Sequence, residues 1–273
     1  MKAVLQKPVA YCQMAIAILL FGTSLPVSQV LTKEIGVFEG TAIRLTVASV
    51  LFLPILWKYR NEIAKITSID AILVILIGAS LIAVSGLMLG STRFAPCSVI
   101  CTVTCLTPVV TGLGAILFVR DRPHPGQLGW ILFAACCALL IRSTCAQSDS
   151  QNCESMMLVF GVALSSVAVI CEASGILMAK VVTRRLNPLP LAALSTLASV
   201  ILILPATLIG SGYVDLAGLT TNAWLAVFWW GAGGIWAGTW LWYSGIQQTS
   251  ATTAAVFLST LPFVTIAMSW ILN

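Results

Sequence analysis

Apolar residues along this chain gather into long runs that are separated by short polar segments. A run of roughly 20 residues crosses ~30 Å of hydrocarbon as an α-helix, which rises ~1.5 Å per residue. Nine such runs predict membrane-spanning helices at 10–32, 36–57, 69–90, 97–119, 126–146, 155–179, 188–210, 222–245 and 251–273. The segments between them are too short for a soluble domain, so we expect an all-α polytopic membrane protein whose function lies inside the helical bundle.

The composition agrees with this pattern, because 59% of the residues are hydrophobic and only 8% are charged. Soluble domains carry about 25% charged residues to cover their surface. The basic start followed by an apolar run is also typical of a signal peptide, but no small-residue cleavage site follows, so we expect the first helix to be retained. The net charge of +5 is spread over several loops, and it therefore predicts no nucleic-acid partner.

The loop charges predict how the chain crosses the bilayer. If the N-terminus lies in the cytoplasm, ten of the 14 Lys and Arg residues fall on the cytoplasmic side of nine spans. Cytoplasmic loops of membrane proteins carry an excess of these residues. We therefore expect a cytoplasmic N-terminus.

Two sequence matches indicate an internal repeat. "TVASVLFLP" from Thr46 aligns with "TLASVILILP" from Thr196 at an offset of 150, and an offset of 154 superposes Pro108 on Pro262. These offsets predict two repeats, 1–146 with five helices and 155–273 with four. Because five is odd, the second repeat enters the membrane in the opposite sense, and such inverted repeats are typical of transporters that work by alternating access.

The second repeat has no counterpart of the helix expected at 126–146. Three explanations are open: the sequence is an incomplete fragment of a transporter, a partner covers the exposed face, or the product is defective. The full repeat would give a bundle of ten helices.

Three segments resemble the EamA-like members of the drug/metabolite transporter (DMT) superfamily: "FGTSLPVSQVLTKEIGVFEGTAIRLTVASVLFLP", "CLTPVVTGLGAILFVRDRPHPGQLG" and "LWYSGIQQTSATTAAVFLSTLPFVTIAMSWIL". Phe21-Gly22 stands where the family pattern has Trp-Gly, Arg44 and the two prolines of the repeat match it, and Asp121 stands where it has Glu. The resemblance implies a bundle with a central cavity in a bacterial inner membrane. It also implies export of small metabolites, amino-acid-like or drug-like, without a cofactor.

Two ionisable residues lie inside the predicted spans, Arg44 and Glu172. A charge there costs on the order of 3 kcal/mol, so both are candidates for the substrate pathway or for coupling. Each lies ~12 Å deep, from opposite sides, and they could meet or share a zwitterionic substrate. Glu172 could exchange a proton for cargo. Two alternatives are open: Arg44 snorkels to the interface or pairs with Glu39, and Glu172 is a hydrogen-bonded packing residue.

Prolines within the spans predict places where the helices bend. Each proline removes a backbone donor, so that Pro108 would leave the carbonyl of Thr104 without its helical partner. We expect Pro108 and Pro262, which are related by the repeat, and Pro26 to act as hinges or to line a cavity. The alternative is that they form passive kinks that neighbouring helices satisfy.

The span at 222–245 is rich in tryptophan. Trp229, Trp236 and Trp240 follow one another at steps of seven and four, which places them on one face of an α-helix. Such a face could stack on an aromatic or cationic substrate. Contact with lipid or with other helices is the alternative.

The distribution of polar residues argues against an enzyme. The only histidine, His124, lies in a loop, and so we expect no metal site. Four aspartates lie in loops or at the ends of spans: Asp70, Asp121, Asp149 and Asp215. Glu172 thus has no catalytic partner, and no nucleotide-binding signature is present. We expect a secondary transporter with a small-molecule substrate, the bilayer around it and protons as a candidate coupling ion; the alternative is a non-transporting or partner-dependent membrane subunit.

Overall fold

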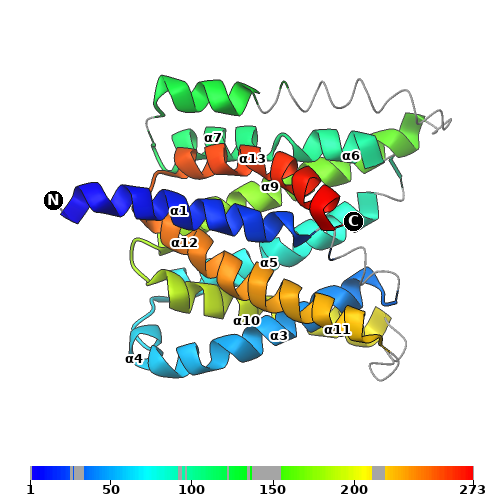
Figure 1. The fold of residues 1–273 in the computed structure, drawn as a ribbon, viewed down its shortest axis with the longest axis horizontal. Coiled ribbons are helices and arrows are strands. Elements are labelled where there is room, and N and C mark those ends of the chain that lie inside the picture. The colour runs from blue at the N-terminus through cyan, green and yellow to red at the C-terminus, as the bar shows by residue number, and fades with distance from the viewer. Residues whose placement is uncertain are drawn as a thin grey trace. The chain divides into compact units, whose positions relative to one another are not determined.

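Figure 1 shows the fold of the chain in a computed structural model. The structure describes residues 2–24, 27, 34–91, 94–95, 97–121, 123–133, 136, 155–210 and 219–272. Pro26 and most of the helix predicted at 126–146 lie outside these residues. Regular structure in the described part of the chain is helical throughout. Its elements are α1 (Lys2–Gly22), α3 (Val37–Lys58), α4 (Arg60–Ile63), α5 (Ser68–Ser91), α6 (Cys97–Thr104), α7 (Thr107–Phe118), α9 (Ser155–Val182), α10 (Pro188–Gly210), α11 (Thr221–Phe228), the π-helix η2 (Trp229–Ala237), α12 (Gly238–Gln248) and α13 (Ala251–Leu272).

Several helices have the length and composition needed to cross a membrane. Four do so by both criteria: Glu39–Lys58, Ser68–Met88, Met156–Val182 and Pro188–Pro205. Shorter apolar helices occupy Lys7–Gly22, Thr102–Phe118 and Ala251–Thr265. The chain is therefore a multi-pass integral membrane protein. Two predicted spans differ from expectation, because 97–119 is divided between α6 and α7, and 222–245 is divided among α11, η2 and α12.

The helices form two compact units, each of which takes residues from both halves of the sequence. The first unit comprises Met1–Ala79, Ala179–Thr249 and Leu261–Asn273, and the second comprises Ser80–Met178 and Ser250–Thr260. Three of the four points of division fall inside α5, α9 and α13, and the fourth lies between α12 and α13.

In the first unit, α1 lies against α12, and α3 lies against both α10 and η2 (Figure 1). Glycine permits the closest approaches. A Cβ atom at Gly231 would lie 2.9 Å from the Arg44 carbonyl oxygen, and one at Gly78 would lie 2.8 Å from the Ser195 carbonyl oxygen. Small residues at such contacts let helix backbones pack tightly where lipid provides no hydrophobic driving force.

Hydrogen bonds tie the end of α9 to the end of α12 within the first unit. The Lys180 ammonium donates to the carbonyl oxygens of Ile246 at 2.7 Å and Gln247 at 3.3 Å, and also to that of Thr249. In return, Nε2 of Gln247 donates to the Thr183 carbonyl oxygen at 2.9 Å. The last carbonyls of a helix have no partner inside it, so these contacts satisfy orphan acceptors at both helix ends.

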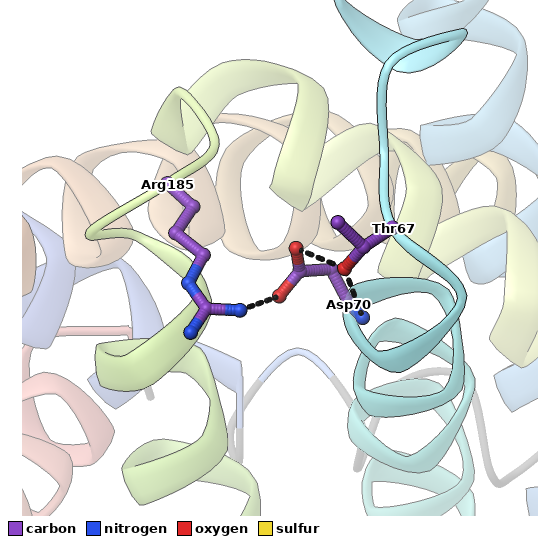
Figure 2. Close-up of polar contacts among 3 residues, drawn as sticks. All are labelled: Thr67, Asp70 and Arg185. Carbon is purple, nitrogen blue, oxygen red and sulfur yellow. Dashed lines mark hydrogen bonds and ion pairs between the residues drawn. The ribbon is translucent and has the colours of Figure 1, made fainter.

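The start of α5 is fixed by a threonine N-cap and an ion pair (Figure 2). The Thr67 hydroxyl accepts the Asp70 amide at 3.3 Å, which satisfies one orphan amide of the helix start, and it donates to Oδ2 of Asp70 at 2.7 Å. Nη1 of Arg185 lies 3.2 Å from Oδ1 of the same carboxylate. The loop after α9 is thereby attached to the N-terminus of α5.

A similar contact fixes the start of α11. The Thr220 hydroxyl caps the helix by accepting the Ala223 amide at 3.3 Å. The Glu34 carboxylate accepts two hydrogen bonds from Thr220, from its hydroxyl at 2.5 Å and from its amide at 3.0 Å. These bonds favour the ionised form of the exposed Glu34 side chain and hold its pKa below the ordinary value of 4.5.

In the second unit, Asp121 caps the N-terminus of α13. Its Oδ2 accepts the amides of Ala251 at 2.6 Å and Thr252 at 3.3 Å. The side-chain amide of Gln127 donates to the Thr253 hydroxyl at 3.0 Å. A carboxylate at a helix N-terminus satisfies orphan amides and interacts favourably with the helix dipole.

Candidate functional site

The helix predicted at 97–119 breaks at the residues before Pro108. Thr104 ends α6, Leu106 precedes α7, and Pro108 lies in the first turn of α7. A proline in a first turn costs no helical hydrogen bond, because the amide that it lacks would have no partner there. Pro262 differs, since it lies inside the continuous helix α13. The roles predicted for Thr104 and the prolines as hinges or cavity lining stay predictions.

Glu172 lies in α9 and points its carboxylate at this broken helix. The Thr107 hydroxyl donates to Oε2 of Glu172 at 3.0 Å, which is the one hydrogen bond that Glu172 makes among the described residues. One turn along α7, the fully buried Thr111 has a hydroxyl without a hydrogen-bond partner in the described part of the chain. No cation among the described residues pairs with Glu172, so an ionised carboxylate at this position would have no counter-charge from them.

Arg44 lies in α3 with its guanidinium stacked on the indole of Trp230. The guanidinium carbon is 3.8 Å from the ring centroid, which is close enough for a cation–π interaction. Its Nε is buried and donates no hydrogen bond to the described residues. The described residues contain a single ion pair, between Arg185 and Asp70. The alternative in which Arg44 pairs with Glu39 is therefore absent from the structure.

The three predicted tryptophans do not share one face. Trp236 lies next to Trp240 and to Phe52 of α3, with ring centroids 6.4 Å and 6.3 Å apart. Trp229 is half exposed, and its indole nitrogen donates instead to the Thr23 hydroxyl at 3.1 Å. The physical reason is the π-helix, whose wider i→i+5 turns end the α-helical spacing on which the prediction depended.

Several residues of this region were missed by the sequence analysis. Trp230, and not Trp229, covers Arg44, and Thr107 is the partner of Glu172. Ser49 of α3 is buried, and its hydroxyl has no partner in the described part of the chain. The only sequence signal for the π-helix is the glycine-rich segment "WWGAGGIWA", which fits a tight contact as well as an altered helix.

Arg44 belongs to the first unit and Glu172 to the second. Each residue is therefore described by its own contact, with Trp230 for the arginine and with Thr107 for the carboxylate. That the two charges meet or share a substrate stays a prediction.

Comparison with known proteins identifies the class of protein that holds these sites. The sequence pattern of the EamA-like transporter family matches residues 8–143 and 159–273. The chain belongs to this family. The two matched segments contain Arg44, Glu172 and the residues that contact them, Trp230 and Thr107.

Two further similarities agree with membership of the EamA family. The chain is 25% identical over 264 residues to the uncharacterized transporter YetK of Bacillus subtilis (strain 168), covering 96% of this chain and 79% of that protein. A solved protein described only as "Crystal structure of protein" matches the fold with a TM-score of 0.76 and 15% identity, covering 98% of this chain and 93% of that one. The EamA chain is thus a membrane transporter of the DMT type and not an enzyme.

Proposed function

We propose that this EamA-family chain is a secondary transporter that exports small metabolites by alternating access and exchanges them for protons at Glu172. The proposal rests on one observation, the Glu172 carboxyl whose single described hydrogen bond comes from Thr107. A carboxyl without a salt bridge can gain or lose a proton without leaving a buried cation unpaired. Ionisable residues of this kind inside membrane spans mark proton relays and substrate paths.

The contacts at two helix starts support an inverted-repeat arrangement. Arg185 follows Glu34 by 151 positions, and Thr220 follows Thr67 by 153, close to the offsets found in the sequence. Glu34 bonds to Thr220, the cap of α11, and Arg185 bonds to Asp70, whose amide is capped by Thr67 at the start of α5. Corresponding loops that attach to corresponding helix starts are what a duplicated unit would produce, although the bonds differ in their chemistry, and inverted repeats provide the two states of alternating access.

The two ionisable residues inside the predicted spans depart from this repeat. At an offset of 150, Arg44 corresponds to Leu194, and at an offset of 153, which superposes Gly22 on Gly175, Glu172 corresponds to Leu19. In each case leucine occupies the corresponding position of the other repeat, so the repeated fold needs no charge at either position. This asymmetry favours a role in transport over a role in folding.

We further propose that the protein lies in a bacterial inner membrane with its N-terminus in the cytoplasm. The distribution of Lys and Arg over the loops supports that orientation. In this orientation, outward export would be driven by protons that enter as substrate leaves.

The test is flux in proteoliposomes that contain the purified chain, with labelled amino acids and small organic acids as probes and an imposed pH gradient. Glu172→Gln should abolish flux driven by the gradient while the protein remains inserted. Glu172→Asp should keep a reduced, pH-dependent flux, because it retains a carboxyl group. Glu62→Gln, at an exposed carboxylate bonded to Asn187, is the matched control and should behave as the wild type.

Flux whose pH dependence survives in Glu172→Gln would overturn the coupling role. Purified wild-type chain that moves none of the probes would contradict autonomous transport of these classes and favour the partner-dependent alternative.

A further inference from the structure

We infer that Arg44 binds the carboxylate of a substrate that carries one negative charge and an apolar body. This inference deepens the proposed function, because it names the substrate class at a site of the same transporter. It rests on polar groups of α3 and η2 that are buried and lack partners among the described residues.

The guanidinium has unused hydrogen-bonding capacity in a defined direction. Trp230 covers one face of the guanidinium at 3.8 Å. The N–H donors of a guanidinium lie in its plane, so the stacked ring does not occupy them. Nε is already buried and without an acceptor in the described part of the chain. A planar carboxylate matches in-plane donors of a guanidinium by two parallel hydrogen bonds. A buried donor left unsatisfied costs free energy, and an arriving acceptor removes that cost.

The charge of the site fits a single negative charge. Among the described residues of the first unit, Lys180 is a buried cation, and its ammonium already donates to three carbonyl oxygens. The guanidinium of Arg44 therefore supplies one positive charge for a bound ligand. A doubly charged anion would keep about one charge uncompensated in a medium of low dielectric, which is strongly unfavourable.

The same two helices provide further polar groups and an apolar surface. The indole nitrogen of Trp236 is buried without a partner in the described part of the chain, and so is the hydroxyl of Ser49. The ring of Trp236 lies next to those of Trp240 and Phe52. They belong to α3 and to the helix that contains η2 and α12, and η2 packs directly on α3, with Gly231 against the Arg44 backbone.

Three probes that share a phenyl ring separate the possible ligands. 3-Phenylpropionate carries only the carboxylate, phenylalanine carries the carboxylate and an ammonium, and phenethylamine carries only the ammonium. Equilibrium binding of each is measured by titration calorimetry on purified protein in lipid nanodiscs, a readout that does not require transport. We expect the acid to bind at least roughly tenfold more tightly than the amine, as a charged hydrogen bond implies.

Variants then test whether Arg44 is the receptor. Arg44→Gln should abolish binding of the acid, and Arg44→Lys should weaken it roughly tenfold, because the charge remains but the planar pair of donors is lost. Trp236→Phe should weaken it less, since one neutral donor is removed. Lys58→Gln, at the other end of α3, is the matched control and should leave the affinity unchanged.

The outcomes separate this inference from the proposed function. Binding of the acid through Arg44 with no flux of any probe would uphold the subsite and contradict transport. Flux with an acid affinity that is unchanged in both Arg44 variants would uphold transport and overturn the subsite. Amine bound as tightly as acid, or no binding of any probe, would also overturn the subsite.

Discussion

Arg44 provides a test in which stability and function should move in opposite directions. Arg44→Met replaces the guanidinium with an apolar side chain of similar length and leaves Trp230 in place. A charged residue in the middle of a membrane span costs about 2.5–3.5 kcal/mol on insertion scales. The contact with Trp230 returns about 0.5–2 kcal/mol, and a methionine sulfur on the same ring returns about 0.3–1.5 kcal/mol. We therefore expect the ligand-free variant to be more stable by at least about 1 kcal/mol, and by about 2.5 kcal/mol from the central values of these ranges.

The free energy of unfolding is measured by SDS titration in mixed micelles, and thermal unfolding gives a second readout. A gain of 1 kcal/mol corresponds to roughly 2–4 °C in chains of 150–250 residues, so a rise of a few degrees is expected. Arg44→Lys is the control and should gain less, because it keeps a cation in the same surroundings.

The opposite sign would refute the reasoning. If Arg44→Met unfolds more easily than the wild type, the guanidinium supports the fold and its missing partners do not indicate a binding site. A stabilised variant that has lost the affinity for 3-phenylpropionate would show that the charge is kept at the expense of stability, as functional sites often require.

Two further predictions concern the caps at helix starts. Asp121→Ala removes the acceptor of the Ala251 and Thr252 amides and should cost about 1–2 kcal/mol in the same unfolding assay, whereas Asp121→Asn should cost less; equal losses would show that the cap is not the contribution of Asp121. Because the pKa of Glu34 is held below 4.5 in the folded protein, its stabilising effect should be present at pH values above 4.5 and lost as the pH falls through the folded pKa. The difference in unfolding midpoint between wild type and Glu34→Gln should therefore shrink on acidification, and a difference independent of pH would contradict this linkage.

The apolar runs predicted four of the long helices to within a few residues. The runs at 36–57, 69–90, 155–179 and 188–210 correspond to α3, α5, α9 and α10. The agreement has a physical reason: the length of an apolar run and its flanking polar residues are local properties, and the bilayer imposes the same length on each helix. The same local pattern led to Arg44 and Glu172, because a charge inside a span stands out from its neighbours.

The partners of these residues could not be predicted from local pattern. Thr107 resembles any small polar residue in a span, and only the packing of α7 near α9 places its hydroxyl beside Glu172. Gly231 of the π-helix packs closely against α3, and this contact is a property of two helices and not of one. The altered turns of the π-helix separate Trp229 from Trp236, which α-helical spacing would place on one face.

The hydrogen bonds of Lys180 and Gln247 also restrict how the transporter can move. Separating the end of α12 from the end of α9 would remove all three carbonyl acceptors of the Lys180 ammonium. It would also leave the Thr183 carbonyl oxygen without the Gln247 donor. Lys180, Thr183 and Ile246 are buried, so water does not readily replace these contacts, and the two helix ends should move together. Conformational change during transport must then occur at other helix contacts. A covalent cross-link between these two helix ends should leave turnover intact.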